Sequence, residues 1–338
     1  MSIRSLLFLL IAAGMLPLFA AACGGEDSKN TITVYSGRTE SLIQPIIDDF
    51  TEETGIKVKV KYGDTAELAA LLAEEGDRSA ADVYIAQDAG ALGAVSAAKL
   101  FETLPAEITG KVAPDYRSAT DEWVGLSGRA RVLVYNPDLV PEAKLPGSVN
   151  DLTDSAWKDQ IGWAPTNGSF QAFMTALRKV EGEDAAAKWL TDMKANGVKD
   201  YKNNKEIVSA VAAGEIKVGL VNHYYLWGFI KDQGEGFKAK NHYFDANDSG
   251  TLINVAGAGV LKSSEKKQHA ESLINYLLSE KAQHYFAEQT FEYPVVTGVE
   301  ADPRIKPLKE IDPPNLDLSN LDDLQGTLVL LRSAGTLP

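Results

Sequence analysis

Strand-like and helix-like segments alternate along the chain from Thr31 onward, and this alternation limits the fold more than any other feature of the sequence. Ile32 to Tyr35 is predicted to be a strand, and apolar residues between Leu42 and Phe50 recur at helical spacing. Apolar and polar residues then alternate from Ile56 to Val60 as in a strand, and Ala66 to Glu75 is helical again. Such alternation is typical of a mostly parallel sheet with helices on both faces, so the sequence predicts the α/β class.

The second half of the chain repeats this alternation with different residues. Strands are predicted at Arg131–Tyr135, Ile161–Ala164 and Ile216–Val221, and the helix that ends at Gly214 is predicted to be capped by Asn204. With 338 residues and 45% hydrophobic content, the chain is long enough for two domains with ordinary cores. Ligands of parallel sheets bind beyond the carboxyl ends of the strands, so the residues at those ends are the first candidates for a site.

The first 22 residues have the features of a secretory signal peptide. Arg4 precedes an apolar stretch, and the small residues Ala20 to Ala22 stand before Cys23. This placement resembles a bacterial lipoprotein processing site, so Cys23 is the predicted lipid anchor and residues 23–30 a linker. As the only cysteine, it excludes a disulfide framework and a multi-thiolate metal cluster. We therefore expect an extracytoplasmic protein anchored by lipid to the membrane, in a periplasm or on the outer face of the cell.

Charge and motif content limit the classes of function. The chain has 33 Lys and Arg against 47 Asp and Glu, a formal net charge of −14, which makes nucleic acid a poor partner. The sequence contains no nucleophile and base at recognisable spacing, no phosphate-loop glycine motif and no HExxH motif. An enzyme is therefore the least favoured class, and a non-enzymatic binding protein is expected.

The strongest candidate site follows the apolar run that ends at Val221 and comprises Asn222, His223, Tyr224 and Tyr225. Neighbouring residues inside a strand point to opposite faces, so both tyrosines share one ligand only if the strand has already ended. A phenol has a pKa near 10 and ionises at neutral pH only beside a strong positive charge such as a trivalent metal. The alternative is that one tyrosine packs in the core and the other contacts water.

Three further side chains each allow two interpretations. Asp88 could supply a metal-binding carboxylate or could cap the helix that follows it. Arg38 could hold a carbonate or phosphate, because guanidinium binds such oxyanions bidentately, or could form a surface salt bridge. Tyr35 could be a third phenol or a core residue. Of the histidines, His223 alone lies beside the site, where we expect it to support the ligands rather than bind metal.

A helix start at Asn167, Gly168 and Ser169 is a plausible anion cradle, because it presents unpaired N–H groups and the positive end of the helix dipole. Capping alone explains many such sequences.

Several segments, in this order, resemble the periplasmic ferric-ion-binding proteins of bacterial ABC iron uptake. They are ITVYSG (32–37), ADVY (81–84), LSGRAR (126–131), APTNGSF (164–170), NHYY (222–225), GAGVLKS (257–263) and EYP (292–294). The resemblance implies a two-lobed fold, with two mostly parallel sheets flanked by helices and a ligand cleft between the lobes. It places lobe 1 at 31–130 and 255–305, and lobe 2 at 131–254 and 306–338, with crossings near Arg129 and Asn254.

The resemblance also implies roles for individual residues. Tyr224 and Tyr225 match the tyrosine pair whose phenolates hold Fe(III), and a synergistic anion, carbonate or phosphate, completes the coordination. The residues that match anion-holding positions are Asn167, Gly168, Ser169, Asn204 and Asn222. Thr39 and Gln87 stand where some members have a histidine and a glutamate ligand, so we expect them to surround the site together with His223. A third tyrosine of other members is replaced here by Asn167 or Gly168.

The leading prediction is therefore a monomeric receptor that closes on Fe(III) and a small anion and delivers the ion to an ABC permease in the cytoplasmic membrane. The second prediction is a receptor that has lost iron and binds phosphate, a phosphonate or a similar oxyanion. This second prediction is favoured by Thr39 and Gln87, which stand where some family members have metal ligands.

Overall fold

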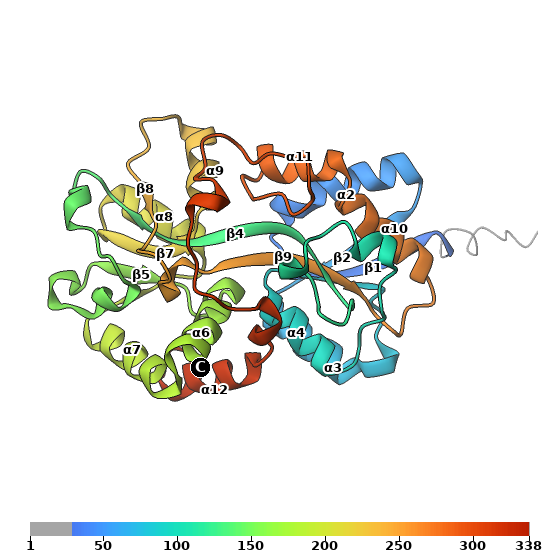
Figure 1. Cartoon of the computed structure of the whole chain (residues 1–338), viewed down its shortest axis with the longest axis horizontal. Helices are drawn as coiled ribbons and strands as arrows, with labels where there is room; N and C mark the ends of the chain where they lie inside the picture. The colour runs from blue at the N-terminus through green and yellow to red at the C-terminus, as the bar shows by residue number, and fades with distance from the viewer. Residues whose placement is uncertain (1–28, 338) are drawn as a thin grey trace, which may run out of the picture.

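The computed structural model describes residues 29–337, so the predicted signal peptide and Cys23 lie outside the described residues. Figure 1 shows strands and helices arranged in two lobes. The strands are β1 (Thr31–Ser36), β2 (Lys57–Tyr62), β3 (Val83–Ala86), β4 (Val124–Tyr135), β5 (Ile161–Trp163), β6 (Lys199–Asp200), β7 (Val218–Asn222), β8 (Lys240–His242) and β9 (Ile253–Val260). The helices are α2 (Glu40–Thr54), α3 (Thr65–Glu75), α4 (Ala89–Ala97), α5 (Ala106–Thr109), α6 (Gly168–Glu181), α7 (Glu183–Ala195), α8 (Asn204–Ala213), α9 (Tyr224–Gln233), α10 (Lys267–Leu277), α11 (Glu280–Glu288) and α12 (Leu324–Ser333).

The strands form one connected path in the order β2-β1-β3-β9-β4-β7-β5-β6, and β8 pairs with β4. The outer pairs β1–β2, β1–β3, β5–β6 and β5–β7 are parallel, as the alternation of strands and helices predicts. The pairs that involve β4 or β9 are antiparallel, and these two strands run between the lobes in opposite directions. The α/β class is confirmed, and the pairing is less parallel than predicted.

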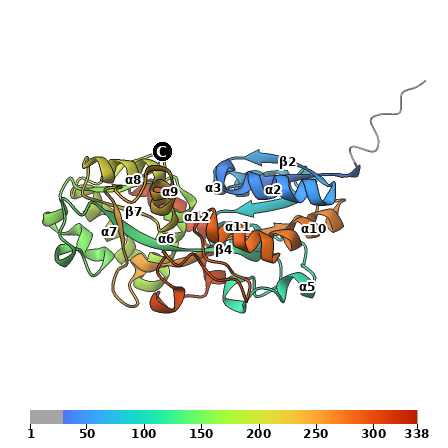
Figure 2. The same ribbon diagram turned by 90° about the horizontal axis from the view of Figure 1, so that it is seen from above.

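Lobe 1 contains β1–β3 with α2–α5, α10 and α11, and lobe 2 contains β5–β8 with α6–α9 (Figures 1 and 2). The long strands β4 and β9 pass from one lobe to the other and pair with each other between them. Arg129 and Asn254, the positions expected for the crossings, are register partners in this pair. All twelve residues of β4 are buried, so each polar side chain on this strand must find its partners inside the protein.

Each lobe has its own apolar core. The lobe 1 cluster includes Ile32, Phe50 and Leu92, and two clusters fill lobe 2, one around Trp163 and one around Tyr224 and Tyr225. The chain end contacts both lobes. Four leucines (Leu318, Leu321, Leu324 and Leu328) pack with the lobe 1 cluster, whereas Leu331 packs in lobe 2. The predicted assignment of 306–338 to lobe 2, like the other lobe boundaries, stays a prediction.

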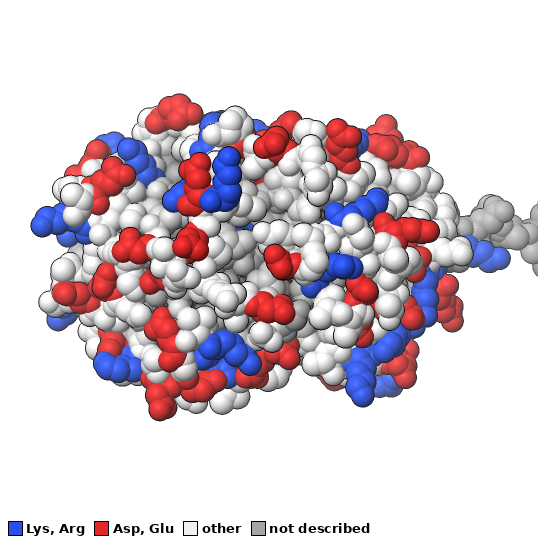
Figure 3. All heavy atoms as spheres, viewed as in Figure 1, with Lys and Arg blue, Asp and Glu red and all other residues white. Residues whose placement is uncertain are grey.

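Local predictions differ from the structure mainly at element ends. Asn203, not Asn204, caps α8, since its side chain accepts the Glu206 N–H at 3.0 Å. The strand predicted to begin at Ile216 begins two residues later, at Val218. On the face seen in Figure 3, acidic and basic side chains are interspersed over both lobes.

Candidate functional site

The tyrosine pair lies at the junction of β7 and α9. β7 ends at Asn222 and α9 begins at Tyr224, so the strand has ended before the two tyrosines, as the sequence required. Both side chains are buried, and their ring centroids are 4.3 Å apart. The hydroxyl of Tyr224 is buried without a hydrogen-bond partner. Burial, followed by the neighbouring Tyr225, raises the pKa of Tyr224 well above its ordinary value, so this phenol needs added positive charge to ionise.

His223 is held inside the protein by both ring nitrogens. Nδ1 accepts the Ala130 N–H at 3.1 Å, and Nε2 lies 2.9 Å from the Phe291 carbonyl oxygen, to which it donates as the N–H tautomer. Burial lowers the pKa of His223 to about 4, so the ring is neutral at physiological pH. The ring also packs edge-on against Tyr224. Both ring nitrogens of His223 are therefore engaged by backbone groups, and its predicted supporting role beside the tyrosine pair stays a prediction.

Three buried arginines lie beside the pair, and we call Arg38, Arg129 and Arg131 the arginine floor. Each is at most 2% exposed. Arg129 and Arg131 are two residues apart on β4, so their side chains leave the same face of the strand. Arg129 lies close enough to Tyr224, and Arg131 close enough to both tyrosines, for the phenolate forms to interact electrostatically with the guanidinium groups.

Glu292 is the carboxylate that faces the arginine floor. It forms a bidentate ion pair with Arg38, with N–O distances of 2.7 and 2.5 Å, and its Oε1 lies 4.0 Å from Arg129 Nη1. Although burial acts to raise the pKa of Glu292, the charge and hydrogen bonds of Arg38 hold it below its ordinary value. Arg38 is therefore a buried ion-pair residue, and the surface salt bridge considered from the sequence is wrong.

Several donors of the floor are left without partners. Arg129 donates from Nη2 to the Val255 carbonyl at 3.2 Å, and Arg131 donates from Nη1 to Asn222 Oδ1 at 3.3 Å. In the floor, the buried nitrogens without a partner are Arg38 Nε, Arg129 Nε and Nη1, and Arg131 Nε and Nη2, and Nδ2 of Asn254, the register partner of Arg129, is a further one. Burial lowers the pKa of Arg131 to about 9, so it stays charged at neutral pH.

The predicted anion cradle, Asn167 to Ser169, is called the α6 turn below. Asn167 Oδ1 accepts the Ser169 N–H at 3.1 Å and an Asn204 Nδ2–H at 3.2 Å. Ser169 Oγ accepts amide hydrogens from Asn222 at 3.1 Å and from Gln87, in the other lobe, at 3.3 Å. The structure thus brings all five expected anion-binding residues of lobe 2 together, and the side chains of Asn167 and Asn204, and of Ser169 and Asn222, are paired with one another.

Asp88 lies across the interface from the α6 turn. Its Oδ1 accepts the Ala91 N–H at 2.9 Å, so the capping interpretation describes its role in α4. Its Oδ2 lies against Gly168, where an added Cβ would be only 2.7 Å from this oxygen and 3.3 Å from Thr65 Cβ. Burial raises the pKa of Asp88 to about 6. Only glycine at 168 allows the two lobes to meet so closely.

The remaining candidates lie apart from the tyrosine pair or take other roles. The side chain of Thr39, which precedes α2, is exposed. The Tyr35 hydroxyl donates to Glu75 at 3.1 Å, so Tyr35 belongs to the outer part of lobe 1, as the core interpretation allowed. Sequence reasoning missed Arg129, Arg131 and Glu292 as site residues. The available signal was the arginine pair at i and i+2 inside an otherwise apolar strand.

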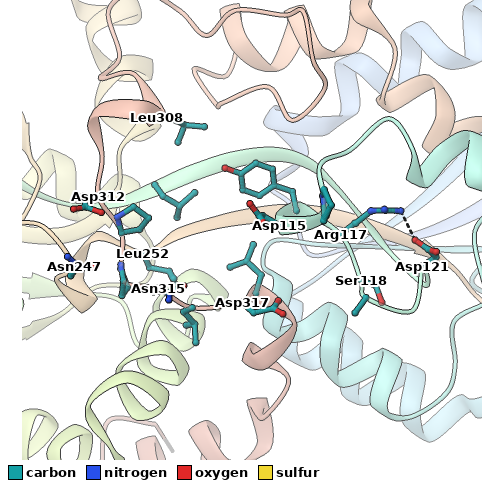
Figure 4. A pocket seen from close by; sticks show the side chains of 18 residues that line it. Asp115, Arg117, Ser118, Asp121, Asn247, Leu252, Leu308, Asp312, Asn315 and Asp317 are labelled. Carbon is teal, nitrogen blue, oxygen red and sulfur yellow. Dashed lines mark hydrogen bonds and ion pairs between the residues drawn. The ribbon is translucent and has the colours of Figure 1, made fainter.

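A cavity of about 850 Å³ lies beside β4 and β9, between the segment that precedes β4 and the chain that leads to α12 (Figure 4). Asp115, Asp312 and Asp317 line it, and Arg117, the basic residue of the lining, is paired with Asp121 at 2.7 Å. None of the predicted site residues lines this cavity. Its acidic lining is unsuited to an anion.

A family model described as bacterial extracellular solute-binding protein matches residues 78–319. The chain belongs to this family. The Fe(3+)-binding periplasmic protein of Serratia marcescens is 35% identical to this solute-binding protein over 97% of this chain and 96% of its own length. The major ferric iron-binding protein of Neisseria meningitidis is 36% identical, over 94% and 97%. The iron-bound HitA structure from Pseudomonas aeruginosa has a TM-score of 0.87 and 37% identity, covering 90% of this chain and 99% of that one.

These comparisons confirm the two-lobed architecture and the extracytoplasmic class of this solute-binding protein. The relatives that favour the oxyanion prediction are more distant, since a putative 2-aminoethylphosphonate-binding protein of Salmonella typhimurium is 25% identical over 84% of the chain. Among the described residues, no helix has the length and apolar character needed to cross a membrane.

Proposed function

We propose that this solute-binding protein binds Fe(III) through the phenolates of Tyr224 and Tyr225 together with a small synergistic anion, and delivers the ion to an ABC permease. The observation that carries the proposal is the buried tyrosine pair, with the Tyr224 hydroxyl free of any partner, in a chain whose relatives are named for ferric ion. Fe(III) supplies the strong positive charge that the Tyr224 phenol, whose pKa is raised by burial, needs in order to ionise.

The ligand set in this proposal is small. Asp88 caps α4 and faces Gly168, so we leave it out of the metal ligands. Both ring nitrogens of His223 are engaged by backbone groups, so we leave His223 out of the metal ligands as well. Two phenolates do not fill the coordination sphere of a ferric ion, and the anion supplies the further hard oxygen donors. Carbonate or phosphate has this chemistry and also balances the charge of the arginine floor.

Delivery requires that the lobes close around the cargo and open at the permease. Contacts across the lobes support the closing step, since Gln87 donates to Ser169 and Gly168 lies against Asp88 and Thr65. A ligand that binds the closed state better shifts the population towards it. Small-angle scattering with ferric ion and phosphate should therefore report a more compact particle than scattering of the iron-free protein.

Cys23 is the proposed lipid anchor, and the receptor is proposed to act as a monomer at the outer side of the cytoplasmic membrane. Cys23→Ser should release the mature protein from membranes or leave the precursor uncleaved. An intact mass that shows an unmodified Cys23 in the native host would contradict the anchor.

The direct test of the function is the visible absorption band of phenolate–Fe(III) charge transfer. Ferric salt added with bicarbonate or phosphate should produce the band in the wild type and in the control Tyr276→Phe, whose phenol hydrogen-bonds to Glu53 in lobe 1. Tyr224→Phe and Tyr225→Phe keep the ring but remove one donor each, so both should stay folded and lose most of the band.

Acid is a second test of the same ligands. Phenolate binding releases protons, so the affinity for ferric ion should fall as pH drops and the band should bleach. Full-strength, pH-independent ferric binding in both Phe variants would rule out the tyrosine pair as the metal site.

A further inference from the structure

A second cavity, of about 370 Å³, lies against α9, the helix that begins with the tyrosine pair, and we call it the α9 pocket. Leu226, Trp227 and Ile230 line it from α9, where residues three and four apart share one face of the helix. The rest of the lining comes from the segment 235–243, which contains β8, and from the chain that follows α11. Neither tyrosine of the pair lines the pocket, so it is separate from the proposed ferric site.

Basic side chains predominate among the charged residues of the α9 pocket. The charged residues that line it are Glu235, Lys240, Arg304 and Lys306. This balance is the reverse of that in the whole chain, in which 47 Asp and Glu outnumber 33 Lys and Arg. Arg304 binds Asp302 through Nε and Nη2, and a guanidinium has five N–H donors, so donors remain for a ligand. The pocket therefore attracts an anion.

Aromatic rings stand beside these cations. The guanidinium carbon of Arg304 lies 6.0 Å from the centre of the Trp227 ring, and Lys306 Nζ lies 5.1 Å from that of Tyr243. Phe237 supplies a third ring to the lining. Aromatic side chains offer a large apolar surface with a specific stacking geometry, which suits another flat ring. An occupant of the pocket thus needs a flat apolar body as well as a negatively charged group.

Two polar atoms of residues that line the pocket are buried and have no hydrogen-bond partner within residues 29–337. They are Nε1 of Trp227, which is a donor, and Oδ1 of Asn241, which is an acceptor. The other amide atom of Asn241, Nδ2, donates to the His223 carbonyl at 2.8 Å, which fixes the orientation of the amide. Buried polar groups in folded proteins nearly always have partners, so these two atoms call for a ligand that both accepts and donates.

Several kinds of occupant would leave part of this lining unpaired. A metal ion or a polyamine would bring positive charge to three basic residues, with one carboxylate in the lining to balance it. Inorganic phosphate would pair with the cations but leave the three rings uncovered. A hydrocarbon would cover the rings but leave both buried polar atoms without partners. An aromatic acid with a hydroxyl group satisfies all of these groups.

We propose that the α9 pocket binds a small aromatic carboxylic acid that carries a hydroxyl group. The carboxylate pairs with Arg304 and Lys306 through charge-assisted hydrogen bonds. The ring of the ligand packs against Phe237, its oxygens accept the Trp227 Nε1–H, and its hydroxyl donates to Asn241 Oδ1. No metal takes part in this binding, so the inference goes beyond the ferric function and does not rest on it.

Calorimetric titration of iron-free mature protein with 4-hydroxyphenylacetate tests the proposal, because this probe has the ring, the carboxylate and the hydroxyl. Wild-type protein should bind it at one site. The uncharged 4-hydroxyphenylacetamide and the ringless acetate should each bind at least about tenfold more weakly. Arg304→Gln and Lys306→Gln should each weaken binding of the acid about fivefold or more, since each removes a charge that faces the carboxylate.

Lys309→Gln is the matched control, because Lys309 is an exposed base of the same segment that does not line the pocket. Its affinity should stay within about twofold of wild type. Circular dichroism checks the fold of each variant, and Arg304→Gln, at an exposed side chain, is sufficient if Lys306→Gln does not fold. Equal affinities in Arg304→Gln and Lys309→Gln would overturn the proposal, as would the absence of any uptake of 4-hydroxyphenylacetate.

The indole N–H resonances give a second measurement in the same iron-free protein. The chain has five tryptophans, and Trp227→Phe identifies the Trp227 peak by its loss while keeping a ring in the wall of the pocket. This peak should shift when the acid binds, because Nε1–H gains an acceptor, and a peak that stays in place would contradict the assignment. Tighter binding of a pentapeptide with a C-terminal tyrosine than of the free acid would assign the pocket to a partner's chain end and overturn the small-ligand proposal.

Discussion

The arginine floor and the α6 turn both line the lobe interface, and they differ in how their buried polar groups are paired. In the α6 turn, Asn167 and Ser169 have protein partners from both lobes. In the arginine floor, five guanidinium nitrogens have none. An unpaired buried donor costs about 1–3 kcal/mol, so the arginine floor has more to gain from a ligand that accepts hydrogen bonds than the turn has. The contrast teaches that the helix start, which the sequence resemblance picked out, is the better paired of the two regions in the folded protein.

Among the variants that test the difference between the arginine floor and the α6 turn, Glu292→Gln should have the largest effect on stability. The variant keeps the shape of the side chain but removes the charge that faces Arg38 and Arg129, and breaking a buried ion pair costs about 3–5 kcal/mol. Urea denaturation of iron-free protein should show a loss of this size, and added phosphate should restore part of it. Glu280→Gln, at an exposed carboxylate, is the control. Equal stabilities of the two variants would mean that the floor does not depend on Glu292 for charge balance.

Asp88→Asn tests whether a buried carboxylate already faces the α6 turn. Burial raises the pKa of Asp88 from 3.8 to about 6. A raised pKa in the folded state means that the contribution to stability is complete below about pH 4 and is lost as pH rises through 6, by up to about 3 kcal/mol. Asparagine keeps the helix cap but does not titrate. Urea denaturation of iron-free protein should therefore show the free energy of unfolding of Asp88→Asn rising relative to wild type between pH 4 and pH 7. A difference that does not change with pH would contradict a buried, titrating carboxylate at Asp88.

Gly168→Ala tests the close approach of the lobes at the turn. The added Cβ would lie 2.7 Å from Asp88 Oδ2, and overpacking of this kind costs about 1–3 kcal/mol. Because the clash arises where the lobes meet, ferric affinity should fall about tenfold or more. Gly228→Ala on α9 adds a Cβ in open space and is the matched control. Equal ferric affinity in the two variants would show that the lobes do not close at Gly168.

Ser169→Ala should have the smallest effect and sharpens the contrast between the two regions. The variant leaves amide hydrogens of Gln87 and Asn222 without their acceptor, which should lower the free energy of unfolding by about 1–2 kcal/mol. Urea denaturation of the iron-free variant measures this loss, and an unchanged free energy of unfolding would contradict the pairing of Ser169 with the two amides.

The parts of the fold and site that sequence predicted well are those with local causes. The position of Tyr224 and Tyr225 after a strand follows from an apolar run and its end, and the α/β class follows from the order of the elements. A cap position is less well determined, because Asn203 and Asn204 have the same chemistry and only the backbone selects Asn203.

The parts that sequence could not supply depend on distant contacts. Arg38 and Glu292 are separated by 254 positions and meet only in the folded protein. Asp88 faces Gly168 only when the two lobes come together. The direction of Arg129 and Arg131 could be inferred from their spacing, but the absence of partners for their nitrogens is a property of the packed interior.

The location of the anion in a crystal of the protein loaded with ferric ion and phosphate tests the account most directly. The anomalous signal of iron and the density of the phosphate give both positions independently. We expect iron within bonding distance of the oxygens of Tyr224 and Tyr225, with phosphate oxygens completing its coordination. Iron bound away from both tyrosine oxygens would contradict the account.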